Sequence, residues 1–314
     1  MKIRDILILI AIAILLSAVS IQIGQWSYSW LPPQASTESG LIDNTISFLV
    51  TLGSFIFLGV TGTVIYSVIL HRASEEDLTD GLPIEGNITL EVVWTVIPVF
   101  LVIWIAGYSY NIYQQMGIQA PGHGSHPNML MDAAYAETLN SSGKENLESS
   151  DSLVTPVENT VENIQVDAKQ WAWVFRYPES NVTSTELHLP VNQRIRFALQ
   201  SEDVIHGFYV PAFRVKQDIV PNETINFELT PTRIGEYRLS DSQYSGTYFA
   251  AMEANVVVES AEDYQKWLHQ AAKQKPSIAN NQAAQEYAQN EQQEFQNGWQ
   301  TVPPAAPPLV NYHT

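Results

Sequence analysis

The sequence predicts a membrane-anchored all-β protein, in which N-terminal transmembrane helices are followed by a β-sandwich domain. Three observations give this prediction. Nearly all of the strongly apolar sequence lies before residue 113, most of the charge lies after residue 131, and the region 162–260 alternates short strand-like runs with turn residues. The chain therefore consists of an apolar N-terminal part and a charged C-terminal part, and its mean hydropathy close to zero conceals this division.

Composition excludes several classes of protein. The 15 Lys+Arg and 33 Asp+Glu residues give a formal net charge of −18. This charge argues against a nucleic-acid partner, because nucleic-acid binding needs basic surface to displace phosphate counterions. The chain has no cysteine, so disulfides, thiolate metal ligands and cysteine nucleophiles are all excluded.

The first apolar block covers residues 6–24 and follows Lys2 and Arg4. Two interpretations stay open, a membrane helix and a signal peptide, because a basic flank before an apolar run is typical of both. No small-residue cleavage motif comes directly after the block, and Trp26 stands where an interfacial aromatic belt would lie. We therefore expect residues 1–24 to be an N-terminal transmembrane helix, or an uncleaved signal.

A transmembrane helical hairpin is predicted over residues 41–115, from uncharged blocks at 46–70 and 92–110. Each block is long enough to cross the ~30 Å hydrocarbon core of a bilayer at ~1.5 Å per residue. The internal Pro98 is acceptable because neighbouring membrane helices can satisfy the carbonyl group that it frees.

Positive charges predict the orientation of these helices. Lys2 and Arg4 precede the first block and Arg72 follows the second, whereas the loop 25–44 has no Lys or Arg. This distribution places the N-terminus inside and the C-terminal domain outside, on a periplasmic or lumenal face. We expect an integral protein of a bacterial plasma membrane or of an internal, thylakoid-type membrane, in contact with membrane lipid.

Two regions are predicted to lack a packed core. The region 116–161 is rich in Gly, Ser, Asn, Glu and Thr and is expected to be a flexible linker. The region 261–314 is expected to be a short helix and a disordered tail, because Gln, Asn, Ala and Pro dominate its end. His123 and His126 in the linker could be metal ligands, but two His without a fixed frame are better interpreted as solvated.

The region between them, 162–260, shows period-two alternation in short runs separated by Pro, Gly and Asn. The runs are 164–166, 171–177, 186–189, 194–199, 224–229, 236–239 and 254–258. So many short strands in one region predict a β-sandwich or a β-barrel.

Four segments of the chain resemble subunit II of haem-copper terminal oxidases. They are 85–98 (EGNITLEVVWTVIP), 169–175 (KQWAWVF), 203–218 (DVIHGFYVPAFRVKQD) and 235–252, which begins GEYRLS and ends in Met252. The resemblance implies a cupredoxin domain at 162–260, and it implies subunits I and III of such an oxidase as partners. Haem and copper would then belong to subunit I.

The last of these segments departs from the family's copper loop. The resemblance places the family's copper and magnesium ligand positions at His206, Asp241, Gln243, Ser245, Phe249 and Met252. Asp241 and Ser245 stand where the family has the two bridging cysteines, and Phe249 stands where it has a second histidine. A thiolate-bridged copper pair needs soft sulfur ligands, so we expect a degenerate dinuclear copper site and no cofactor bound by this chain.

Two weaker metal sites stay open as alternatives. A mononuclear copper could use His206, Met252 and Asp241. Gln243 replaces the glutamate that helps the family to bind magnesium or manganese, and a neutral amide should bind such an ion more weakly.

A degenerate copper site resembles the quinol-oxidase branch of the family. In that branch electrons pass from a membrane quinol directly to subunit I, so cytochrome c is not expected as a partner. The expected function is therefore that of a non-catalytic subunit II of a proton-translocating oxidase that reduces O2 to water. Two alternatives stay open: a conventional cytochrome c oxidase subunit II, and a free-standing membrane-tethered cupredoxin-like binding or assembly protein.

Four further residues match family positions with a role. Trp171 matches an electron-uptake tryptophan, but without copper behind it a packing or interface role is the favoured interpretation. Lys216 and Asp218 match positions close to subunit I, with a surface ion pair as the alternative. Glu91 matches the mouth of a proton-uptake channel, with an interfacial carboxylate as the alternative.

Overall fold

The computed structural model describes residues 3–72, 86–115, 161–292 and 302–313. It divides into two compact units, the first made of the N-terminal helices with Pro211–Arg214 and the second made of the remaining C-terminal part of the chain. The predicted linker at 116–161, with His123 and His126, lies almost wholly outside the described residues.

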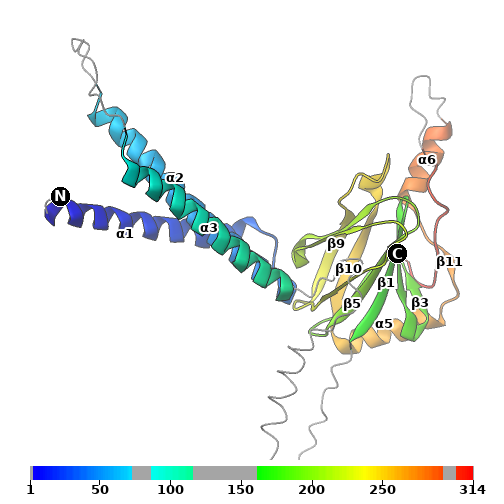
Figure 1. Cartoon of the computed structure of the whole chain (residues 1–314). Coiled ribbons are helices and arrows are strands. Elements are labelled where there is room, and N and C mark those ends of the chain that lie inside the picture. Colours follow the sequence, from blue (N-terminus) through cyan, green and yellow to red (C-terminus); the bar gives the residue numbers. More distant parts are fainter. Residues whose placement is uncertain (1–2, 73–85, 116–160, 293–301, 314) are drawn as a thin grey trace, which may run out of the picture. The chain divides into compact units, whose positions relative to one another are not determined.

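Three long helices form the first unit: α1 (Ile3–Trp26), α2 (Thr37–Leu70) and α3 (Ile88–Gln115) (Figure 1). All three are long and apolar enough to cross a membrane, which confirms the three predicted spans. Most of their large apolar side chains are exposed in the isolated chain, as expected for helices whose surroundings are lipid or other subunits. Helix α2 starts at a capping box in which Ser36 and Ser39 satisfy each other's backbone N–H groups.

Helix α1 packs closely on α2 at Gly24. A Cβ atom at Gly24 would lie 1.8 Å from the Thr51 hydroxyl oxygen, so no larger residue fits there. The Ser47 hydroxyl donates to the Gly24 carbonyl oxygen over 2.8 Å, and the Ser20 and Ser27 side chains of the same interface are buried. Small residues at helix interfaces allow the backbones to approach, which is the usual basis of helix association in a membrane.

Two five-stranded sheets form the second unit (Figure 1). In one sheet the order β3-β2-β1-β5-β8 joins Val182–Ser184, Ala172–Tyr177, Glu162–Lys169, Ile195–Ser201 and Ile225–Leu229. In the other the order β4-β10-β9-β6-β7 joins Leu187–Pro190, Glu253–Glu259, Gly235–Asp241, His206–Val210 and Val215–Ile219. The pairs β1–β5 and β10–β4 are parallel and the others antiparallel. This is a cupredoxin-like sandwich, and it confirms the predicted fold class.

Alternating side chains of the two sheets make the core. Phe197 on β5 is fully buried, and its ring stacks on Phe227 of β8 at 4.9 Å and contacts Phe208 of β6 at 5.9 Å. The burial of β5 alternates along the strand, in agreement with the period-two pattern of its sequence. Three strands of the sandwich are not among the seven alternating runs. Val182–Ser184 is too short to show a period, and His206–Val210 and Val215–Ile219, which pair with each other, lie in the segment 203–218.

The expectation of a disordered C-terminal tail is wrong for the described residues. After helix α5 (Ala261–Lys273) the chain forms β11 (Ser277–Ile278), α6 (Gln282–Gln292) and β12 (Leu309–Val310). Ala283 and Val310 are completely buried, and Asn311 and Thr183 exchange hydrogen bonds at the sheet edge. A few small apolar side chains are enough to attach this tail, because the folded domain already supplies the surface that they bind. The composition of the tail therefore does not reveal them. We call residues 277–292 and 302–313 the C-terminal strap.

Candidate functional site

The site is centred on His206, which begins β6, and Asp241, which ends the neighbouring strand β9. Both side chains are completely buried, and His206 Nδ1 lies 2.8 Å from Asp241 Oδ2. The other ring nitrogen, Nε2, lies 2.9 Å from Oδ1 of Asp203, whose side chain is 28% exposed. The imidazole is therefore held between two carboxylates, one on each nitrogen.

Asp241 also organises the loop that follows it, residues 241–252. Its Oδ1 accepts hydrogen bonds from the backbone N–H groups of Gly207 and Gln243, over 2.7 and 3.0 Å. Its Oδ2 accepts from the Ser245 hydroxyl over 2.7 Å in addition to His206. A buried carboxylate with this many donors has its lone pairs satisfied, which is the condition for a stable buried charge.

The electrostatics of the three groups are mutually consistent. Burial alone would lower the pKa of His206, but hydrogen bonds to Asp203 and Asp241 and their negative charges raise it above its ordinary value of 6.5. Burial would raise the pKa of Asp241, but the donors from His206, Gln243, Ser245 and Gly207 lower it below 3.8. The pKa of Asp203 is likewise lowered, because hydrogen bonds from His206 and two backbone N–H groups outweigh its burial. All three pKa shifts favour the charged forms, which are a protonated His206 and two ionised carboxylates.

This arrangement does not fit a copper ion. A histidine ligand must present an unprotonated ring nitrogen to the metal, whereas both ring nitrogens of His206 lie within 2.9 Å of carboxylate oxygens. Within the described parts of the chain, no group of three or more His, Cys, Asp or Glu side chains is suited to hold a metal ion. Asp203 and Asp241 lie at opposite ring nitrogens, so one ion could not contact all three side chains.

The structure places the remaining copper-loop residues as follows. Phe249 lies in a short 3-10 turn (Phe249–Ala251), where its ring contacts Tyr244 edge-on at 5.2 Å. Met252 is buried, and its carbonyl oxygen accepts from the indole N–H of Trp173 and the backbone N–H of Asp241. Met252 thus accepts hydrogen bonds through its backbone carbonyl, and Phe249 belongs to an aromatic pair in the loop.

Gln243 and Asp218 form one contact of the site with strand β7. The Gln243 amide Nε2 donates to Asp218 Oδ1 over 2.8 Å. Lys216 and Asp218 both lie on the exposed side of β7, yet no ion pair joins them among the described residues. A role of these two residues next to another subunit stays a prediction, with a surface role as the alternative.

Trp171 is attached directly to the 241–252 loop. Its indole Nε1 donates to the Ser245 carbonyl oxygen over 3.2 Å, and only 2% of the residue is exposed. Gly246 has φ +118°, and a Cβ there would lie 2.7 Å from Cζ2 of Trp171, so glycine is needed both for the turn and for the close approach. The ring of Tyr248 covers the indole edge-on at 5.2 Å.

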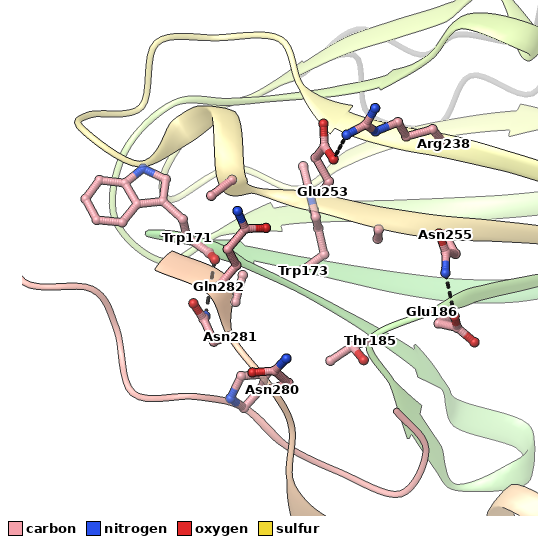
Figure 2. Close-up of a pocket in the computed structure, with 14 residues that line it drawn as sticks. Trp171, Trp173, Thr185, Glu186, Arg238, Glu253, Asn255, Asn280, Asn281 and Gln282 are labelled. Atoms are coloured by element: carbon pink, nitrogen blue, oxygen red, sulfur yellow. Dashed lines mark hydrogen bonds and ion pairs between the residues drawn. The ribbon is translucent and has the colours of Figure 1, made fainter. Parts of the chain in front are cut away.

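A cavity of about 440 Å³ lies beside Trp171 and Trp173 (Figure 2). Its polar walls are mostly paired with each other: Arg238 with Glu253, and Asn255 with Glu186. The strap forms the remaining wall through Asn280–Gln282, and Asn281 donates to the Trp171 carbonyl oxygen. The cavity is therefore a gap between the strap and the sandwich that polar pairs line.

Glu91 lies in the first turn of α3 and is exposed in the isolated chain. Asn87 caps this turn by accepting from the backbone N–H of Leu90, and the Thr95 hydroxyl donates to the Glu91 carbonyl oxygen. A carboxylate at a helix N-terminus is favoured by the helix dipole, which explains its position without assigning it a role.

Sequence reasoning missed two parts of this site. Asp203 was noted only as the first residue of the segment 203–218. Its position three residues before His206, together with Asp241 at a family ligand position, could have indicated that both carboxylates contact the imidazole. The strap was missed because its contacts with Trp171 and Tyr248 join residues far apart in the sequence.

The fold and the site define a class of protein, which is a membrane-anchored protein with a cupredoxin-like domain. The 241–252 loop of this domain is held by a hydrogen-bonded ionic network. Two family models match, the transmembrane domain of cytochrome c oxidase subunit II over residues 24–112 and its periplasmic domain over residues 181–261. The chain is 34% identical over 273 residues to a cytochrome c oxidase subunit 2 of Thermostichus vulcanus, covering 82% of this chain and 83% of the relative. The chain therefore belongs to the cytochrome c oxidase subunit II family.

Two further relatives have names that refer to different electron donors. A cytochrome c oxidase subunit 2 of a Synechocystis species is 31% identical over 278 residues, covering 85% of this chain and 83% of the relative. A quinol oxidase subunit 2 of Bacillus subtilis is 24% identical over 247 residues, covering 78% of this chain and 66% of the relative. The family thus includes members named for both kinds of electron donor.

Proposed function

We propose that this chain is a subunit II without a dinuclear copper centre, in a terminal oxidase that takes electrons from a membrane quinol and reduces O2 to water. The observation that carries the proposal is the position of His206, which has a carboxylate oxygen within 2.9 Å of each ring nitrogen. Electrons would pass from quinol to subunit I, and this chain would cap and anchor subunit I without catalysing a step.

The chemistry of the loop supports the loss of copper. A dinuclear copper centre of the kind that the resemblance implies needs bridging thiolates, and Asp241 and Ser245 at those positions offer a carboxylate and a hydroxyl that already bond to each other. The carboxylate also gives the imidazolium the negative partner that it needs when buried. His206, Asp241 and Ser245 therefore satisfy one another's hydrogen bonds, without the ligand role that the resemblance gives to these positions.

A conventional cytochrome c oxidase subunit II is the second candidate. The names of the relatives at 34% and 31% identity favour it over the quinol oxidase relative at 24% identity. Identity over a whole chain weighs a few ligand positions very lightly, however, and the donor depends on those positions. We therefore place more weight on the local chemistry of His206, Asp241 and Ser245.

The proposal includes the setting of the chain. The N-terminus would lie inside and the sandwich outside, following the Lys and Arg distribution. Subunits I and III would be the partners, with haem and copper in subunit I, and Lys216 and Asp218 would face subunit I. Glu91 would stand at the mouth of a proton-uptake route into that subunit, because ionisable groups at membrane helices usually serve ion or proton pathways.

The test is a donor and metal assay on the purified complex. Oxygen consumption is measured with a quinol and, separately, with reduced cytochrome c, and copper is counted against haem. We expect turnover with quinol alone and no copper beyond that of subunit I. A near-infrared dinuclear-copper band, or sustained cytochrome c oxidation, would falsify the proposal.

A further inference from the structure

Trp171 is covered although it lies beside the 241–252 loop, which the resemblance matches to the family's copper loop. Its indole donates to the Ser245 carbonyl oxygen, so the ring touches the 241–252 loop directly. A protein that delivered electrons to this loop would have to reach this ring or the residues around it. The residue is nevertheless only 2% exposed.

Two layers make this cover. The inner layer is the loop itself, in which Gly246 lets the backbone approach the indole and Tyr248 lies edge-on against it at 5.2 Å. The outer layer is the C-terminal strap, in which the ring of Tyr287 on α6 backs Tyr248 at 6.5 Å. Tyr248 is itself only 7% exposed, so the inner layer is supported from outside.

Hydrogen bonds fix the strap to the backbone of Trp171. The Asn281 amide nitrogen donates to the Trp171 carbonyl oxygen over 3.2 Å, while its amide oxygen accepts from the backbone N–H of Ala284 over 2.9 Å (Figure 2). One side chain thereby holds Trp171 and caps the first turn of α6. The backbone N–H of Ala305 also donates to the Gln170 carbonyl oxygen.

The far end of the strap is anchored separately. Asn311 exchanges backbone and side-chain hydrogen bonds with Thr183, and Val310 is buried in a cluster with Val174 and Ala279. Both described parts of the strap are therefore attached to the sandwich. Swinging the strap off Trp171 would break polar and apolar contacts together.

We propose that the C-terminal strap closes the Trp171 face to the docking of soluble protein donors. This inference rests on the proposed function, in which electrons come from a membrane quinol. Charge alone would not exclude a basic cytochrome, because a chain with a net charge of −18 attracts one. A steric cover removes the docking surface while leaving the charge unchanged.

The test loosens the strap in the purified complex with the double substitution Asn281→Ala and Tyr287→Ala. Gln289→Ala is the matched control, since Gln289 is an exposed amide on the same helix. Exposure of Trp171 is measured as the acrylamide-quenchable fluorescence that disappears when Trp171→Phe is added to each variant. Binding of a basic c-type cytochrome is measured at low and high salt, and assembly is checked by haem content and quinol oxidation.

We expect Trp171 to become quenchable in the double variant alone, and cytochrome binding to rise about tenfold at low salt and to vanish at high salt. Quinol oxidation should be unchanged. The inference fails if Trp171 is already quenchable in the parent complex, if it stays protected in the double variant, or if exposure brings no gain in binding. Copper content and donor use of the parent complex decide the proposed function independently, since neither measurement depends on the strap.

Discussion

His206 Nδ1 lies 2.8 Å from Asp241 Oδ2, and both side chains are completely buried. Asp241 stands where the resemblance expects a bridging cysteine, so one substitution replaces a metal ligand by the partner of a cation. In the proposed copper-free subunit, this pair would hold the loop in place of the metal. Its consequences for stability, metal content and assembly can be measured.

The first prediction concerns the pH dependence of stability. The pKa of His206 is raised above 6.5, so its stabilisation is complete below pH 6.5 and is lost as pH rises through the folded-state value. The pKa values of Asp203 and Asp241 are lowered below 3.8, so theirs is complete above pH 3.8 and is lost as pH falls through the folded-state values. Denaturant unfolding of the chain in detergent should show its greatest stability between these limits. A maximum above the folded-state pKa of His206 would contradict the assignment.

The second prediction is that Asp241→Asn destabilises the chain by about 3 kcal/mol, because it leaves a buried imidazolium with one neutral neighbour. Asp203→Asn should cost less, since the Asp203 side chain is 28% exposed and water can replace part of its interaction. Unfolding midpoints of the two variants, with the pKa of His206 measured by NMR, check this order. Equal losses for the two variants would count against a central role for Asp241.

The third prediction restores the metal. The triple substitution Asp241→Cys, Ser245→Cys and Phe249→His should bind two copper ions with a near-infrared band, because it supplies two bridging thiolates and a second imidazole. It also removes one of the two carboxylates that hold the His206 protons. Ser245→Cys alone should bind none, since Asp241 would still occupy His206. Absence of copper from the triple variant would mean that the loop is not aligned as we have placed it.

The fourth prediction concerns helix α1. Gly24→Val should destabilise the helical unit by about 2 kcal/mol, because overpacking forces the two helices apart. Gly59→Val on α2 is the control, since a Cβ there meets nothing within 4 Å. Unfolding in detergent measures both.

Because α1 packs on α2 in this way, mass spectrometry of the mature protein should also find residues 1–24 present.

The fifth prediction tests Glu91 in the assembled complex. Glu91→Gln should slow oxygen reduction and shift its pH profile, whereas Glu91→Asp should restore most of the rate, because the role requires an ionisable group. A structural role at the start of α3 would instead leave the rate unchanged in both variants. Steady-state oxygen consumption over a range of pH distinguishes the two.

Much of the fold followed from local patterns. The three spans follow from uninterrupted apolar blocks, and the inward face of strands such as β5 follows from period-two alternation. The strands Val182–Ser184 and Val215–Ile219 could not be found in this way. Their positions depend on pairing with neighbours, and their own sequences show too little alternation.

The sequence by itself determined that this chain has membrane helices, a β-sandwich and a copper loop without its sulfur bridges, because composition, period and residue identity carry those facts. Only the tertiary structure decided which groups surround His206, since Asp241 reaches it from 35 residues further along the chain. It also decided that a tail with a composition typical of disorder is a strap over Trp171, because its few anchors bind a surface that exists only once the sheets have formed.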